Sequence, residues 1–155
     1  MSFNNSLEIG KMGERLARKR LEDAGFKTKD SSDKSVDFYV TINKKEYSCE
    51  VKHDVYSNRS GNLCFEVFNT KSGKPSGIAG TTCELWFHVL NEAEIYFAKA
   101  EDLKKYVETN KPFREVNGGD ANSFMKLFKK DIVLNSVLIC LNKDGIKEIV
   151  DNELS

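Results

Sequence analysis

The sequence predicts one α/β domain over residues 1–155, and three observations lead to that fold class. Apolar residues recur at spacings of three and four near the start of the chain, which is the period of an amphipathic helix. Short runs rich in β-branched and aromatic residues follow, separated by polar turns, and another helical pattern comes after them. The chain contains no Pro- or Ser-rich linker, internal repeat or low-complexity tract. We therefore expect helices and strands packed in a single domain.

The first half of the predicted domain is one helix followed by three strands. Residues 6–24 form the helix, because their apolar and small residues fall on one side, and Gly25 is a natural stop signal. A polar stretch ending at Ser35 then leads to two β-rich runs, which are separated by hairpin spacing. The three predicted strands are 36–42, 46–52 and 63–68.

The second half of the predicted domain begins with a long loop. Residues 69–82 are rich in glycine and contain few large apolar side chains, so we expect a long surface loop with room for a short helical turn, and loops of this length are often functional. Two strands and a helix follow, and the C-terminal region is less regular. The expected elements are strands at 85–90 and 95–98, helices at 101–108 and 124–130, a loop at 117–120, and a hairpin of 137–141 with 146–150.

The composition is typical of a soluble globular protein, with 39% apolar and 31% charged residues. No apolar run approaches the ~20 residues that a membrane-spanning helix needs, and the first residues lack the pattern of a signal peptide. The four cysteines form no CxxC pair and have no histidine at zinc-site spacing, so we expect buried thiols. These observations predict a cytoplasmic protein that has no membrane partner.

The zero net charge hides a gradient along the chain. Up to Pro75 there are 14 basic and 11 acidic residues, and after it 10 basic and 13 acidic, so the two halves carry +3 and −3. Proteins that bind nucleic acid carry basic surfaces, because phosphate contacts dominate their affinity. A basic first half is compatible with such a surface, and it is equally compatible with a solvated helix face and turn lysines.

The stretch that carries chemistry is Glu50-Val51-Lys52, thirteen residues after Asp37. In a strand, residues i and i+2 point to the same face, so Glu50 and Lys52 project together while Val51 enters the opposite side. If Asp37 lies on the paired strand of the hairpin, two carboxylates and one ammonium converge. Two carboxylates with a backbone carbonyl form an oxygen-rich site suited to Mg²⁺, which takes hard oxygen ligands.

Such a site has the parts needed for phosphodiester hydrolysis. A metal lowers the pKa of a coordinated water and neutralises charge on a phosphate, and a lysine orients that water or stabilises the transition state. The alternative is an exposed strand pair without a function. A second acidic residue two positions before a lysine, Asp102 with Lys104, falls in a predicted helix, where such positions do not face each other.

Three short motifs stand out together: Gly13-Glu14, Val36-Asp37 and Glu50-Val51-Lys52. In combination they resemble the PD-(D/E)XK nuclease superfamily, and most closely its archaeal Holliday-junction resolvase branch and small phage-encoded relatives. The resemblance covers residues 8–68. Val36 stands where the motif has its proline, and the long loop and C-terminal region exceed a minimal resolvase.

The resemblance implies a restriction-endonuclease-like core, with a mixed central β-sheet flanked by helices. It further implies a metal-dependent endodeoxyribonuclease that uses Mg²⁺, with Mn²⁺ as a substitute, bound by Asp37, Glu50 and the carbonyl of Val51. Lys52 is then the catalytic lysine, and Glu14 completes the acidic cluster through a coordinated water. Resolvases act symmetrically on two strands, so the implied partners are branched or structured DNA and a second copy of the chain.

Further residues are expected around this site. Glu66, a charged residue inside an apolar run, either faces solvent or adds an acidic, water-binding group to the site. Ser76 is the other accessory candidate, since polar loop residues often contact phosphates. His88 is interpreted as a half-buried, hydrogen-bonded histidine rather than a ligand. Contacts to the DNA backbone are expected from Arg15, Arg18, Lys19, Lys34 and Arg59.

Two alternatives stay open beside the nuclease hypothesis. A catalytically inactive protein of nuclease fold would bind nucleic acid or a protein partner without cutting, although the presence of all four expected site residues argues against this. A plain interaction domain, in which the Glu50-Val51-Lys52 stretch is coincidental, would place Asp37 far from Glu50. The distance between these two residues in the fold therefore discriminates the second alternative from the others.

Overall fold

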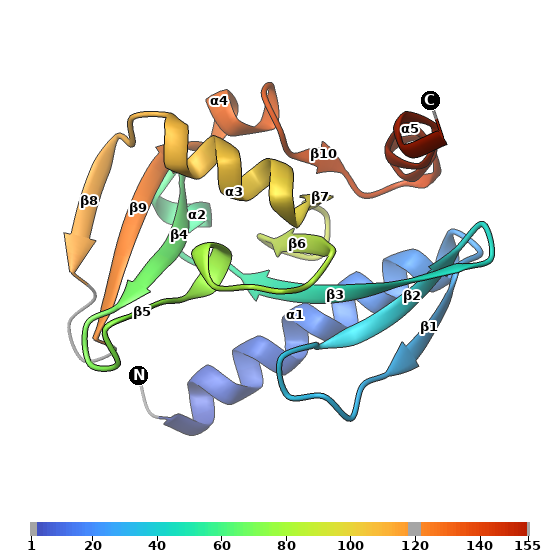
Figure 1. Ribbon diagram of the computed structural model, residues 1–155, viewed down its shortest axis with the longest axis horizontal. Coiled ribbons are helices and arrows are strands. Elements are labelled where there is room, and N and C mark those ends of the chain that lie inside the picture. The colour runs from blue at the N-terminus through green and yellow to red at the C-terminus, as the bar shows by residue number, and fades with distance from the viewer. Residues whose placement is uncertain (1–2, 118–121, 155) are drawn as a thin grey trace.

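The computed structural model describes residues 3–117 and 122–154 and contains a six-stranded and a four-stranded β-sheet (Figure 1). Helix α1 (Phe3–Asp23) packs on one face of the larger sheet, and α3 (Ala100–Thr109) packs on the other. The protein is thus mixed α/β, with a central sheet flanked by helices, as the sequence predicts.

The larger sheet is mixed, because β3 and β6 run parallel while the other neighbouring strands run antiparallel. The β2–β3 turn has left-handed backbone at Asn43 (φ 49°) and Lys44 (φ 68°), as a two-residue type I′ hairpin turn requires. In spatial order the strands are β1 (Lys27–Asp30), β2 (Phe38–Ile42), β3 (Lys45–His53), β6 (Leu85–Val89), β7 (Ile95–Lys99) and β10 (Ile139–Cys140).

The smaller sheet is antiparallel and begins directly after β3, since only the short helix α2 (Ser57–Ser60) separates β3 from β4. Its apolar side chains Leu63, Phe65 and Phe128 join the core beneath α3. In spatial order the strands are β5 (Lys74–Pro75), β4 (Asn62–Asn69), β9 (Ser123–Lys129) and β8 (Arg114–Asn117). The two sheets therefore meet where β3 ends.

Helix α1 lies close against β3 because its contact face carries small residues. A Cβ atom at Gly13 would lie 2.6 Å from the Cβ of His53, so a larger residue at position 13 would push the helix away from the strand. Farther along the helix, Ala17 and Leu21 are buried with the strand residue Phe38. The helix thus fixes the side of β3 opposite to Glu50.

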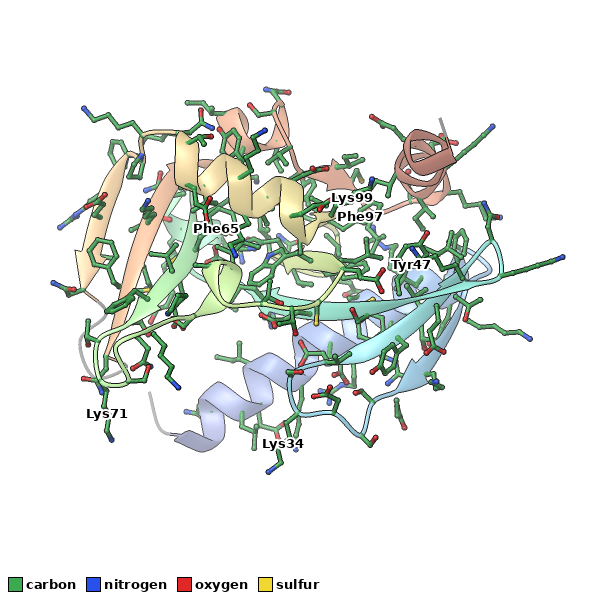
Figure 2. All side chains as sticks on the ribbon, in the orientation of Figure 1. Lys34, Tyr47, Phe65, Lys71, Phe97 and Lys99 are labelled. Atoms are coloured by element: carbon green, nitrogen blue, oxygen red, sulfur yellow. The ribbon has the colours of Figure 1, made fainter. Side chains whose placement is uncertain are left out.

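The remaining elements close the two cores. The short 3-10 helix η1 (Gly77–Ala79) buries Ile78 completely beside α3, and α4 (Lys130–Leu134) follows β9. Helix α5 (Lys143–Leu154) adds Ile146 and Ile149 to the core beneath α1. Figure 2 shows Phe65 and Phe97 inside the molecule, one from each sheet. Among the described residues, no helix is long and apolar enough to cross a membrane.

The predicted elements of the first two thirds of the chain are confirmed, with small shifts at their ends. Those elements are the helices at 6–24 and 101–108 and the strands at 36–42, 46–52, 63–68, 85–90 and 95–98. Four details differ from the prediction, and two of them are the short elements α2 and β5, which lie inside stretches predicted as loops. Strand β1 was not expected, because its four residues are polar and mostly exposed and it pairs only with β2 among the described strands. The loop over 69–82 is not entirely on the surface, since it buries Ile78.

The C-terminal predictions are wrong in three places. Residues 124–130 form most of β9 rather than a helix, because β4 and β8 supply strand partners on both sides of an apolar run that fits either period. Strand β8 was not expected. The predicted hairpin of 137–141 with 146–150 is instead the short strand β10, which pairs with β7, followed by α5. Of the predicted loop at 117–120, Asn117 ends β8 and the rest lies outside the described residues.

Candidate active site

The candidate site lies where β3 extends beyond β2. The antiparallel pairing of these strands ends at Phe38 opposite Cys49, whereas the parallel pairing of β3 with β6 continues to His53. One edge of β3 is therefore left open from Glu50 onward, next to the residue that precedes β2. That residue is Asp37.

Asp37 is attached to this open edge by two hydrogen bonds. Its backbone N–H donates to the Cys49 carbonyl over 2.9 Å, and its carboxylate Oδ2 accepts from the Val51 N–H over 2.7 Å. In an extended strand the N–H and C=O of one residue point toward the same neighbour, so the Val51 carbonyl lies on the Asp37 side as well. A carboxylate and a carbonyl thus share the edge of β3, which excludes the alternative that Asp37 is far from Glu50.

Glu50 and Lys52 lie on the face of β3 away from α1. Their partners on β6, Trp86 and His88, belong to the core beneath α3, whereas Val51 packs against the core beneath α1. Glu50 is half-buried and accepts a 3.0 Å hydrogen bond at Oε1 from the hydroxyl of Thr81, and Lys52 is exposed. The alternation that the sequence implies for this strand is present.

Burial raises the pKa of all three acidic residues of the site, and the charge of Asp37 adds to the rise at Glu50 and Glu14. Burial is the main cause of the raised pKa of Glu50, and the charges of Asp37 and Glu66 raise it further against the opposing Thr81 hydrogen bond. Burial raises the pKa of Asp37, and the hydrogen bond from the Val51 N–H opposes this rise. Burial and then the Asp37 charge raise the pKa of Glu14 on α1. Such a row of carboxylates is stabilised by a nearby cation.

Glu14 contributes charge without joining a compact ligand group. In the described part of the chain, no three His, Cys, Asp or Glu side chains come together as a metal-binding group. The predicted ligand set differs from such a group, because its third oxygen is the Val51 carbonyl rather than a side chain. Glu14 lies at the α1 side of the site, where its charge interacts with that of Asp37.

Glu66 and Ser76 lie beside Glu50, on the side of the site away from α1 and Glu14. The hydroxyl of Ser123 donates to Glu66 Oε1 over 2.6 Å, and a Cβ at Gly77 would lie only 2.3 Å from the Glu66 carbonyl oxygen, so η1 presses onto β4 at this point. A small hollow of about 220 Å³ is lined by Glu50, Ser76 and residues near Thr81. The Ser76 hydroxyl oxygen is buried there without a hydrogen-bond partner among the described residues.

The five basic residues expected to contact DNA differ in whether their side chains are already paired within the protein. Arg18 is engaged within the protein, with its guanidinium 2.6 Å from Asp30 and above the ring of Phe38. Lys19 pairs with Asp23 over 2.9 Å at the exposed surface. The other three, Arg15, Lys34 and Arg59, are exposed, and Figure 2 shows Lys34 extending away from the protein.

Two features of the site were not predicted individually. Thr81 appears in the sequence as one polar loop residue among several, yet it is the hydroxyl that holds Glu50. Asp54 is 2% exposed and accepts hydrogen bonds at Oδ2 from the Cys64 N–H (2.8 Å) and from His88 Nε2 (3.0 Å). The expected hydrogen bonding of His88 is confirmed, but its side chain is fully buried rather than half-buried. The signal for Asp54 was its place two residues after Lys52, on the same face.

Comparison with solved structures finds a bacterial homing endonuclease, I-Ssp6803I. The two share a TM-score of 0.51 and 15% sequence identity, over 63% of this chain and 70% of that chain. No family model matches the chain, and no curated protein matches it either. At this identity the likeness concerns the fold alone, so the protein has a nuclease-like fold, and the resemblance to PD-(D/E)XK resolvases stays a prediction.

Proposed function

We propose that this protein is a Mg²⁺-dependent endonuclease that hydrolyses DNA phosphodiester bonds. The observation that carries the proposal is the 2.7 Å hydrogen bond from the Val51 N–H to Asp37 Oδ2, because it brings a second carboxylate to the strand end from which Glu50 and Lys52 project. The fold shared with a homing endonuclease supports the same class of reaction.

The donor set at the end of β3 fits a hard divalent cation. Asp37 and Glu50 offer carboxylate oxygens and Val51 offers a carbonyl, which are the ligand types that Mg²⁺ and Mn²⁺ accept. A cation among them would offset the repulsion that contributes to the raised pKa of Glu50. When bound, Mg²⁺ would supply Lewis-acid stabilisation of the charge that develops on the phosphate.

The other residues act on water and on the phosphate. The exposed ammonium of Lys52 would orient the attacking water or stabilise negative charge on the phosphate. In the hydrolysis, water oxygen bonds to phosphorus and the bond to the leaving oxygen breaks, so no covalent enzyme intermediate is required. Glu14 adds negative charge beside Asp37, and Glu66 and Ser76 are accessory groups on the Glu50 side.

The substrate structure is proposed from the sequence resemblance. Resolvase-like enzymes need two active sites for two strands, so we propose that the protein acts as a homodimer on branched or structured DNA, in the cytoplasm, during recombination, repair or phage DNA processing. Exposed Arg15, Lys34 and Arg59 would contact the DNA backbone, and Arg18 and Lys19 would do so only by exchanging their present acidic partners.

Cleavage of supercoiled, linear and branched DNA in Mg²⁺, Mn²⁺ or EDTA tests the proposal. We expect cleavage only with metal, and losses of about 10²-fold or more in Asp37→Asn, Glu50→Gln and Lys52→Met. Asp102→Asn is the matched control, because Asp102 also lies two residues before a lysine but is exposed on α3. The proposal fails if the wild type is inert on all three substrates or the site variants keep full activity. Binding without cleavage would favour the non-cutting alternative.

A further inference from the structure

A cavity of about 300 Å³ adjoins the candidate active site. It lies between the end of β3, the N-terminal half of α1 and the strands β4 and β9, and its walls include Ile9, Cys64 and Met125. The Cys64 thiol lies 3.2 Å from the Met125 sulfur, so the wall formed by β4 and β9 is continuous at this point. This volume is at the lower end of the range for ligand pockets, which suits one small planar group.

Lys52 joins this cavity to the candidate active site. It lines the cavity, while its neighbour on the same strand face, Glu50, lines the smaller hollow beside Thr81. A phosphate held at Lys52 would therefore have the larger cavity on one side. The next chemical group along a nucleic acid strand is a sugar with its nucleobase.

The floor of the cavity carries a fixed carboxylate. Asp54 lines the cavity and is 2% exposed; its Oδ2 accepts from the Cys64 N–H and from His88 Nε2. Trp86 Nε1–H donates to His88 Nδ1 over 3.1 Å, so Nδ1 is an acceptor and Nε2 is the atom that donates to Asp54. Burial raises the Asp54 pKa, but the hydrogen bonds from His88 and the Cys64 N–H, together with the charge of Lys52, outweigh it and leave the pKa below its ordinary value.

The second oxygen of Asp54, Oδ1, is the available polar group. Among the described residues it accepts no hydrogen bond, so it offers an ionised acceptor for a ligand N–H in a cavity whose lining also includes apolar Ile9 and Val55 and the polar residues Lys52 and His53. A phosphate inside the cavity would meet the negative charge of Asp54 and be repelled. The ligand that fits carries an N–H edge on a flat apolar ring, which describes a nucleobase.

Tyr56 supplies an aromatic surface at the same cavity. Its side chain is 64% exposed although it is a large aromatic residue, and it follows the cavity residues Asp54 and Val55 directly in sequence. Aromatic rings at nucleic-acid-binding sites stack on unpaired nucleobases, and every nucleobase offers a face for this contact.

We propose that this cavity binds one unstacked nucleobase of the DNA strand whose phosphate lies at Lys52, with Tyr56 as the stacking partner and Asp54 Oδ1 as the acceptor for an N–H of the base edge. This inference rests on the proposed function, since it places the strand by its scissile phosphate. A paired base must leave its stack to enter, so single-stranded, mismatched or branched DNA is the preferred substrate.

Methyl NMR without metal tests the cavity separately from cleavage. The chain has three methionines, so protein labelled with ¹³C at the methionine methyls gives a small set of signals. We expect an unpaired oligonucleotide to shift the Met125 signal upfield by ring current, and an abasic strand of equal length to bind without that shift. Met12, exposed on α1 outside the cavity lining, is the internal reference.

A matched pair of aromatic variants gives the second readout. Tyr56→Ala should weaken binding of the unpaired oligonucleotide about tenfold, as expected for the loss of one base–aromatic contact. Phe113→Ala, which removes a similarly exposed ring (58%) outside the cavity lining, should leave the affinity unchanged. Binding of both strands with no Met125 shift, or with equal shifts, overturns the nucleobase proposal and leaves the nuclease proposal standing. Failure of the protein to bind either strand also overturns the nucleobase proposal, whereas the nuclease proposal is decided by the cleavage assay with metal.

Discussion

The backbone N–H of Val51 donates to Asp37 Oδ2 over 2.7 Å, although the two residues are 14 positions apart in the chain. The hydrogen bond forms because β2 begins one residue after Asp37, so its pairing with β3 stops at Cys49 while β3 continues with an open edge. One carboxylate therefore replaces a strand partner at the position where Glu50 and Lys52 project. This relation between strand end and carboxylate is the basis of the proposed metal site.

Glu50→Gln should stabilise the metal-free protein at pH 7. The folded-state pKa of Glu50 is raised, mainly by burial, so its contribution to stability is present below the unfolded pKa and is lost as pH rises through the folded value. An ionised Glu50 therefore destabilises the empty site, and we expect the variant to gain on the order of 1 kcal/mol in urea unfolding. Glu46→Gln, an exposed change on the same strand, should give no gain.

Adding Mg²⁺ should make the wild type more stable than the Glu50→Gln variant. Metal at 100 times its dissociation constant would stabilise the wild type by about 2.7 kcal/mol and leave Glu50→Gln nearly unchanged. The same unfolding measurement in Mg²⁺ and in EDTA checks this. Equal effects of Mg²⁺ on both proteins would argue against Glu50 as a ligand.

Asp54→Asn should destabilise the protein at pH 7, in contrast to Glu50→Gln. The folded-state pKa of Asp54 is lowered, so its stabilising contribution is present above the unfolded pKa and is lost as pH falls through the folded value, below about pH 4. Hydrogen bonds to a charged group contribute about 1.5–3 kcal/mol, so we expect a loss of this size at pH 7 that narrows at pH 3. Urea unfolding at both pH values measures it, and a pH-independent difference would contradict the assignment.

Gly13→Ala and Gly10→Ala should have opposite effects on stability. At position 13 the new methyl group would lie 2.6 Å from the His53 Cβ, and overpacking of this kind costs about 1–3 kcal/mol. At position 10 no atom lies within 4 Å of the added Cβ, so the better helix propensity of alanine should stabilise by about 0.5–1 kcal/mol. Thermal unfolding of the two variants side by side is the measurement. A stabilised Gly13→Ala protein would show that α1 does not need its close approach to β3.

Thr81→Val should shift the pH dependence of cleavage. The Thr81 hydroxyl donates to Glu50 Oε1 over 3.0 Å and holds the Glu50 pKa down, so its loss leaves burial and the Asp37 charge unopposed. We expect the acidic limb of the pH–rate profile to move to higher pH, with a smaller change at pH 8. Thr82→Val is the matched control, because Thr82 is exposed beside the same hollow and does not donate a hydrogen bond to Glu50, whereas Thr81 does. Identical profiles for both variants would contradict the role of Thr81.

The parts of the site predicted from the sequence are those fixed by local geometry. Two-residue periodicity places Glu50 and Lys52 on one face of β3, and a short hairpin brings the end of β2 beside them. The contact between Thr81 and Glu50 spans 31 residues and depends on the parallel pairing of β3 with β6, which no local pattern indicates. Strand β9 was predicted as a helix for the same reason, because its distant partner strands β4 and β8, rather than its own apolar pattern, decide its structure.

Anomalous scattering from crystals soaked in Mn²⁺ tests the central claim most directly. We expect a single strong peak at bonding distance from the Asp37 and Glu50 carboxylates and the Val51 carbonyl, and no such peak in crystals of Glu50→Gln. A Mn²⁺ peak elsewhere, or no peak at this edge of β3 at a Mn²⁺ concentration that supports DNA cleavage, would contradict it.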